Sequence, residues 1–144
     1  MTAIFLFSVV NAIALLGWII LAIGVILQRP FLRDVVAGLV WPLGFSALYT
    51  ALILFFFRSA PGGFDSLAHV QLLFTSPWAA LAGWVHYLAF DLFIGAWIAR
   101  AVTDRGVTRL VLVLLLPLTF LFGPIGLAGF FISRLALENR KVSA

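Results

Sequence analysis

Two ionisable side chains interrupt one long apolar run of this sequence, and they are the residues best suited to chemistry. His86 and Asp91 lie near the middle of the run Trp78–Ala99. A carboxylate at the centre of a bilayer costs at least about 2.5–3.5 kcal/mol, so it is expected to face the protein interior and to have a partner. The pair favours acid–base chemistry on a hydrophobic molecule. A hydrogen-bonded anchor for helix packing is the structural alternative.

Helix geometry limits how these two residues can act together. Five residues place His86 and Asp91 about 140° apart around a helix and about 7.5 Å apart along it, so we expect no direct hydrogen bond. They can still flank one cavity from two edges of the helix. Tyr87 shares a stripe with Asp91 at i,i+4 spacing. We therefore predict a cavity with Asp91 and His86 as catalytic residues and with Asn11, Trp84 and Tyr87 as substrate-binding residues.

Metal and nucleotide chemistry have little support in the sequence. The chain has no cysteine and two histidines, and His69 lies in a connector rather than in an apolar run. A site of two histidines and one carboxylate would require that connector to fold into the core. No phosphate-binding loop, dinucleotide-binding glycine pattern or nucleophile elbow occurs. We expect no metal and no cofactor, and the lack of a basic face or arm argues against nucleic acid as a partner.

Composition determines the class of protein that positions these residues. Of the 144 residues, 65% are hydrophobic and 10% are charged, whereas soluble domains have about 25% charged residues. Four apolar runs reach the roughly 20 residues that cross a bilayer, and membrane-spanning backbone of this pattern must be helical. We predict an all-α membrane protein with one domain, residues 1–144, folded as an antiparallel bundle of four transmembrane helices. The predicted spans are Ala3–Leu27, Val35–Phe57, Trp78–Ala99 and Leu110–Ser133.

The connectors suggest one further helix and a weak preference for one orientation of the chain in the membrane. In the longest connector, Arg58–Pro77, the spacing of apolar residues predicts a short amphipathic helix at about residues 66–74, lying at the membrane surface. With four spans, the first and third connectors carry five basic residues and the opposite side carries four. Because early loops weigh more in the positive-inside rule, this distribution favours both termini outside. Membrane lipids are the expected neighbours of the basic connectors.

Two segments carry a family resemblance. The run from Gly83 to Phe93, Gly-Trp-Val-His-Tyr-Leu-Ala-Phe-Asp-Leu-Phe, resembles the most distinctive motif of the abscisic-acid-deficient-4-like family. The later Phe122-Gly123-Pro124-Ile125-Gly126 is similar to a Cys/Gly-Pro-hydrophobic-Gly element in the last helix of that family. The plant members are neoxanthin synthases of the chloroplast envelope. Their four-span plan resembles this chain over nearly its whole length.

The resemblance implies a membrane enzyme that acts on a carotenoid-like isoprenoid. The plant reaction rearranges an epoxide end group into an allenic alcohol, which requires an acid at the oxygen and a base at carbon. Asp91 and His86 match the motif, and we assign these two roles to them as a cofactor-free isomerisation. The chain carries no transit peptide and looks bacterial, so we expect a multi-pass protein of a bacterial inner membrane, whose substrate could be another carotenoid.

Two other classes of function stay open at this point. The first is a non-catalytic membrane protein that binds carotenoid or lipid, or that scaffolds carotenoid enzymes. The second is a small transporter or channel, which the sequence favours least because a proton relay needs a chain of ionisable groups and the predicted core has two.

Overall fold

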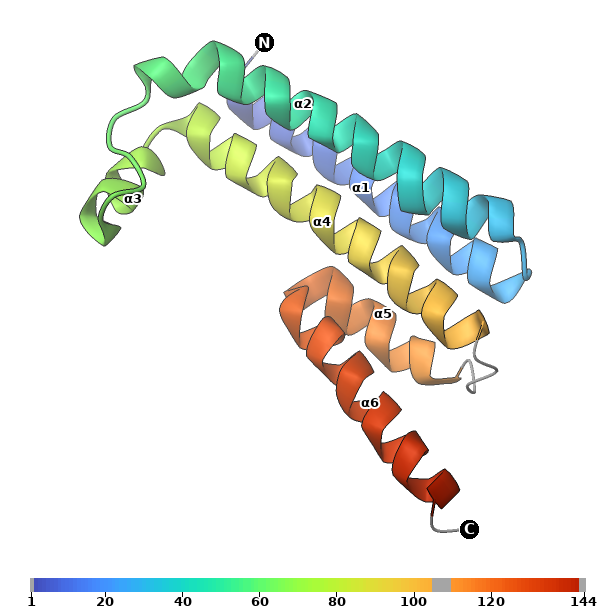
Figure 1. Cartoon of the computed structure of the whole chain (residues 1–144). Coiled ribbons are helices and arrows are strands. Elements are labelled where there is room, and N and C mark those ends of the chain that lie inside the picture. The colour runs from blue at the N-terminus through green and yellow to red at the C-terminus, as the bar shows by residue number, and fades with distance from the viewer. Residues whose placement is uncertain (1, 105–109, 143–144) are drawn as a thin grey trace.

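The computed structural model describes residues 2–104 and 110–142, and that part of the chain is helical without strands (Figure 1). The all-α architecture predicted from the sequence is confirmed. The helices are α1 (Ala3–Ile26), the π-helix η1 (Phe31–Val40), α2 (Trp41–Phe56), the 3-10 turn η2 (Phe57–Ser59), α3 (Leu67–Leu73), α4 (Pro77–Asp104), α5 (Leu110–Phe122) and α6 (Pro124–Val142).

Within residues 2–104 and 110–142, three helical runs are long and apolar enough to cross a membrane: Ala3–Ile26, Phe31–Ser59 and Pro77–Thr103. They lie in the regions predicted as the first three spans, and α1, η1–α2 and α4 pack side by side (Figure 1). Their shared core includes Leu21 of α1 and Leu92 of α4, which are fully buried. Large apolar side chains such as Ile4 (79% exposed) and Phe55 (78% exposed) cover the outside. A surface of this kind is stable against lipid and not against water.

The second run begins earlier than predicted and starts with an unusual winding. The π-helix η1 leads directly into α2 just before Pro42, a residue that would remove one hydrogen bond from a regular α-helix. The first turn of η1 contains Arg33, which is 7% exposed. The Arg33 guanidinium group donates to both carboxylate oxygens of Asp34, at 2.6 and 2.8 Å. This pairing allows two charged residues to join the helix without an isolated buried charge.

The fourth predicted span, Leu110–Ser133, is not a single helix. It breaks at Gly123, whose φ of +30° lies in the left-handed region, and Pro124 then starts α6 in a new direction. A Cβ atom added at Gly126 would collide with Thr119, and one added at Gly129 would lie 3.1 Å from Leu115. Gly126 lies against Thr119 and Gly129 lies against Leu115, so residues farther after Gly123 pack on residues farther before it. The two helices α5 and α6 therefore form an antiparallel hairpin. The prediction of a fourth continuous span was wrong.

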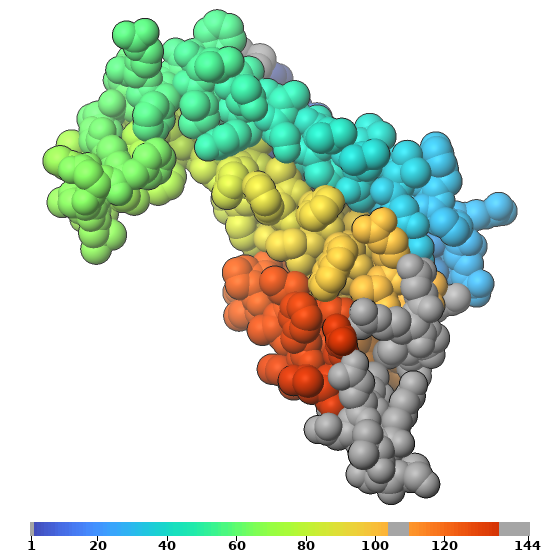
Figure 2. All heavy atoms as spheres, viewed as in Figure 1, coloured from blue at the N-terminus to red at the C-terminus, as the bar shows by residue number. Residues whose placement is uncertain are grey.

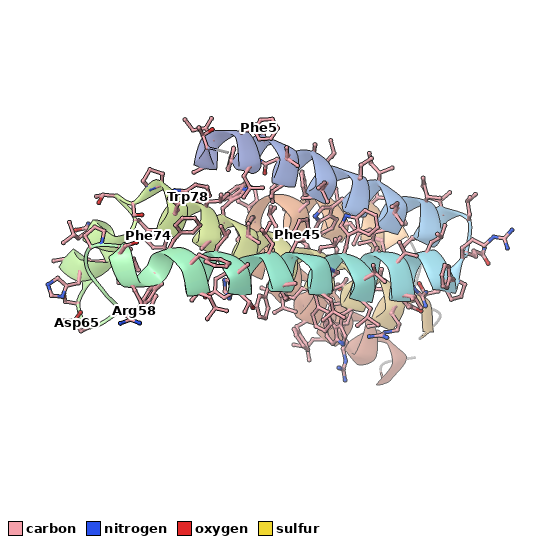
Figure 3. The ribbon with its side chains drawn as sticks, turned by 90° about the horizontal axis from the view of Figure 1, so that it is seen from above. Phe5, Phe45, Arg58, Asp65, Phe74 and Trp78 are labelled. Atoms are coloured by element: carbon pink, nitrogen blue, oxygen red, sulfur yellow. The ribbon has the colours of Figure 1, made fainter. Side chains whose placement is uncertain are left out.

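A short helix does occupy the long connector. The side chain of Ser66 accepts a hydrogen bond from the backbone N–H of His69 and caps α3, and His69 pairs with Asp65 at 2.8 Å. The helix lies beyond the ends of α2 and α4 (Figure 1). Phe74 follows it and packs against Gly83 of α4, which ties the connector to the bundle at the same end as Trp78 (Figure 3). That α3 lies in the membrane plane stays a prediction.

Candidate functional site

Asp91 lies in the interior of the molecule, where α4 meets the α5–α6 hairpin. Its side chain is 5% exposed, and the Tyr87 hydroxyl interacts with its carboxyl group. Its Oδ2 atom is buried and makes no hydrogen bond that meets the geometric criteria among the described residues. Buried carboxylate oxygens are nearly always paired in folded proteins, so an unpaired one requires a specific explanation. A bound substrate group or a proton would satisfy this oxygen.

Gly123 gives the carboxyl group its space. A Cβ atom added at this position would collide with the carboxyl oxygen Oδ1 of Asp91 and would lie 2.9 Å from its Cγ. The residue must therefore be glycine for two reasons, its φ of +30° and the close approach of Asp91. Since α6 begins at the next residue, Pro124, the carboxyl group also lies beside the start of α6.

Tyr87 supports the other side of the same break. Its hydroxyl group donates a hydrogen bond to the backbone carbonyl of Leu121, at 3.1 Å, near the C-terminal end of α5. The last carbonyls of a helix lack partners within the helix, so Tyr87 satisfies one of them. Tyr87 and Asp91 therefore contact the two helix ends at Gly123 from successive turns of α4. The predicted shared stripe is present, and the structure shows a positioning contact for Tyr87.

Asn11 and Trp84 are brought together, but away from Asp91. The indole N–H of Trp84 donates to the side-chain oxygen of Asn11 at 2.8 Å, which links α4 to α1. Trp84 also stacks on Tyr87, with ring centroids 5.3 Å apart. Asn11, predicted as a substrate-binding residue of the cavity around Asp91, is instead bonded to Trp84.

His86 does not share a cavity with Asp91. Its side chain is exposed, and its ring contacts Tyr49 of α2 and Phe90, with centroids 5.5 and 4.7 Å apart. The physical reason is the angle of about 140° between positions five residues apart on a helix. Asp91 faces the α5–α6 hairpin, whereas His86 lies beside α2. The single cavity predicted around Asp91, His86, Trp84 and Asn11 is therefore not formed.

An apolar groove that sequence reasoning missed lies between α1 and α5. Its volume is about 580 Å³, within the range of about 300–1,000 Å³ that small-molecule sites occupy. It is lined by Leu15, Trp18, Ile19, Ala22, Val25, Ile26, Leu110, Leu112, Val113, Leu116, Pro117 and Phe120. No single apolar residue in this set differs from ordinary packing in the sequence, so the groove depends on which helix faces meet.

Two aromatic rings lie between the groove and the surroundings of Asp91. Trp18 and Phe120 both line the groove and pack edge to face, with ring centroids 5.4 Å apart. The Trp18 ring also fills the space over Gly95, one helical turn from Asp91. Because Trp18 is 8% exposed, its ring forms a wall between the groove and the stripe of α4 that carries Asp91.

The expected absence of a metal was based on the separation of the two histidines. His69 pairs with Asp65 in the α3 connector, far along the chain from His86. In the described part of the chain, no group of three histidine, aspartate or glutamate side chains is close enough to hold a metal ion.

Comparison with known proteins gives one family. The family model described as ABA DEFICIENT 4-like matches residues 5–130. The chain belongs to this family. No curated protein and no solved structure matches it significantly. The ABA DEFICIENT 4-like match extends through α4 and the hairpin tip at Gly123, so Asp91 and its immediate neighbours all lie within it.

Proposed function

We propose that this protein is a membrane enzyme that rearranges an end group of a carotenoid-like isoprenoid by proton transfer, with Asp91 as the acid. One observation carries the proposal: a buried carboxyl group with an unpaired oxygen lies one turn from the aromatic wall of an apolar groove. The resemblance to neoxanthin synthases, noted in the sequence, supplies the class of substrate.

The shape of the groove suits a linear hydrocarbon chain. Its α5 wall extends from Leu110 to Phe120, about 15 Å at a rise of 1.5 Å per residue. Its lining is almost entirely aliphatic and aromatic, as sites for hydrophobic ligands are. A polyene lying in the groove would bring its inner end to Trp18 and Phe120, and movement of these two rings would admit the end group to Asp91.

The chemistry requires one proton to reach oxygen and one to leave carbon. In the epoxide rearrangement that the resemblance implies, a C–O bond of the epoxide breaks and the oxygen takes a proton from one oxygen of the Asp91 carboxyl group. A proton leaves carbon at the developing allene and passes to the other carboxyl oxygen. Substrate and product have the same composition, and Asp91 ends as it began. General acid–base catalysis of this type contributes about 10²–10⁴-fold to a rate.

His86 has no part in this scheme. The sequence suggested it as the base, but its exposed ring lies beside Tyr49 rather than beside the carboxyl group. The proposal therefore assigns both proton transfers to Asp91 and leaves Tyr87 as the residue that positions the α5 end of the site.

A non-catalytic carotenoid-binding protein is the second candidate, and one observation favours it. The Trp18 ring separates the groove from the α4 stripe of Asp91, and Asp91 itself contacts the break at Gly123. In this alternative the carboxyl group only holds the hairpin tip. The protein would then bind pigment without changing it.

Filling the groove distinguishes its use from simple lipid contact. We expect Leu116→Trp to abolish both retention and conversion of carotenoid, because the larger side chain projects into the groove. The matched control is Leu114→Trp, also on α5, where the side chain is 65% exposed and lies outside the groove lining. Both variants are expressed in a host that produces epoxycarotenoids, and pigments are analysed by chromatography and mass spectrometry. Equal pigment retention in both variants would contradict binding in the groove.

A further inference from the structure

The depth of the hairpin tip is fixed by its contacts with α4. Tyr87 bonds the carbonyl of Leu121, and Asp91 contacts Gly123. Both α4 residues lie near the middle of the spanning run Pro77–Thr103. The 13 residues of α5 cover about 20 Å at 1.5 Å per residue, less than the roughly 30 Å of a hydrocarbon core. The tip therefore lies near the centre of the membrane.

From this depth, α6 returns toward the end of α4 from which the hairpin came. Trp97, six residues beyond Asp91, packs edge to face on Phe130, seven residues beyond Gly123, with ring centroids 5.2 Å apart. The two helices thus advance together toward Asp104. The hairpin covers the C-terminal half of α4 in Figure 1, and Figure 2 shows the hollow that remains between it and α3.

A hairpin that ends near the centre of the membrane is stable in lipid only if the backbone N–H and C=O groups at its tip have hydrogen-bond partners within the protein. At the tip, the N–H of Gly123 donates to the carbonyl of Thr119 at 2.9 Å, and the Tyr87 hydroxyl serves the carbonyl of Leu121. Thr119 is fully buried, and its hydroxyl donates to the carbonyl of Leu115. These polar groups at the break therefore have partners within the protein, and Gly123 itself is buried, whereas the side chains of Leu121, Phe122 and Ile125 beside it are exposed and can face acyl chains.

This arrangement changes which basic residues share a side of the membrane. Four full crossings would divide the nine lysines and arginines five to four. With three crossings and a returning hairpin, the order of the sequence assigns eight of the nine to the side of Asp104: Arg29, Arg33, Arg100 and Arg134, which the structure describes, Arg105 and Arg109, which lie outside the described residues, and Arg140 and Lys141, whose side chains it does not describe. The exception is Arg58, at the α3 end of the molecule (Figure 3).

We propose that α5 and α6 enter and leave the membrane on one face, that this basic face lies against the anionic headgroups of the cytoplasmic leaflet, and that the α1 N-terminus and α3 lie on the opposite side. Short connectors rich in lysine and arginine stay in the cytoplasm, and exposed basic residues near an anionic surface are attracted to it. Arg33 adds nothing to this attraction, because it is buried and paired with Asp34. The groove between α1 and α5 then lies in the cytoplasmic half of the membrane. This inference does not depend on the proposed enzyme activity.

Single-cysteine labelling tests this topology directly, because the chain has no native cysteine. The variants are Gln28→Cys in the first connector, Ser59→Cys before α3, and Ser143→Cys, which lies outside the described residues and only marks the C-terminal side. Each full-length variant is produced in a bacterial inner membrane and treated with a membrane-impermeant maleimide. We expect Ser59→Cys to react in intact spheroplasts, and Gln28→Cys and Ser143→Cys to react only after lysis.

Two results would overturn the proposal. Labelling of Ser143→Cys together with Ser59→Cys in intact spheroplasts would show that α6 completes a fourth crossing. Labelling of Gln28→Cys and Ser143→Cys without Ser59→Cys would place the basic face outside the cytoplasm. If a cysteine variant is not produced, C-terminal fusions of the unaltered chain replace it. A fluorescent protein should then be active at the C-terminus, and alkaline phosphatase should be inactive.

Discussion

Replacing Asp91 by asparagine lowers the rate of epoxycarotenoid conversion by about 10²-fold or more, because the proposed proton transfer is lost. The variant protein still folds and retains pigment. Asparagine keeps the size of the side chain and one carbonyl oxygen, so the contact with Gly123 survives. What the amide cannot do is deliver a proton to the epoxide oxygen. Conversion is measured with purified protein in liposomes that contain the epoxycarotenoid, under single-turnover conditions.

The control for this variant is another aspartate outside the bundle. Asp65 pairs with His69 at an exposed position, so Asp65→Asn should leave conversion unchanged. Thermal unfolding of both variants separates loss of activity from loss of structure. Full conversion by Asp91→Asn would rule out proton transfer by this residue and would favour the carotenoid-binding alternative.

Replacing Gly126 by alanine opens the hairpin and destabilises the protein by about 1–3 kcal/mol, the usual effect of adding a methyl group to a packed interior. The added Cβ atom would lie 2.6 Å from the backbone nitrogen of Thr119 and 2.7 Å from its Cα. Backbone atoms cannot rotate aside, so α5 and α6 must separate. In an exposed helix the same change would stabilise the helix by about 1 kcal/mol, and its sign is reversed here by the close approach.

The matched control is Gly44→Ala in α2, where an added Cβ atom meets no atom within 4 Å. The midpoint of thermal unfolding in detergent should fall clearly for Gly126→Ala and should stay level or rise slightly for Gly44→Ala. Pigment conversion should fall with the first variant because Asp91 loses its contact with the hairpin tip. Equal midpoints for the two variants would show that α5 and α6 do not pack as closely as the structure has them.

Much of the fold followed from hydropathy and charge. The first three long runs are helical where lipid leaves the backbone no alternative, and a carboxylate on α4 had to face the interior because of its solvation cost. The i,i+4 spacing of Tyr87 and Asp91 also predicted their shared stripe. These inferences rest on local geometry and on the bilayer as a solvent, both of which a sequence expresses directly.

The hairpin could not be read from hydropathy in the same way. Residues 110–133 are uncharged throughout, so the run looks continuous even though Gly123-Pro124 turns the chain back. The break depends on partners from another helix, chiefly Asp91 and Tyr87. One signal was present: the nearly even division of basic residues in a four-span plan was itself unusual for a membrane protein.

The sequence predicted the burial of Asp91, which the structure shows, while its catalytic role stays a prediction. The sequence indicated Asp91, but a shared motif made His86 look like its partner, whereas their angle of about 140° on a helix already argued for different surroundings. The groove beside Trp18 and Phe120 could not be predicted from the sequence, because aliphatic residues on two helices form a groove only through the way the helices pack together.

Pigment analysis of the unaltered protein in a host that produces epoxycarotenoids is the most direct test of the central claim. We expect a new pigment of unchanged mass, with an altered absorption spectrum, that is present only when the protein is produced. Unchanged pigments that co-purify with the protein would contradict catalysis and support a carotenoid-binding protein.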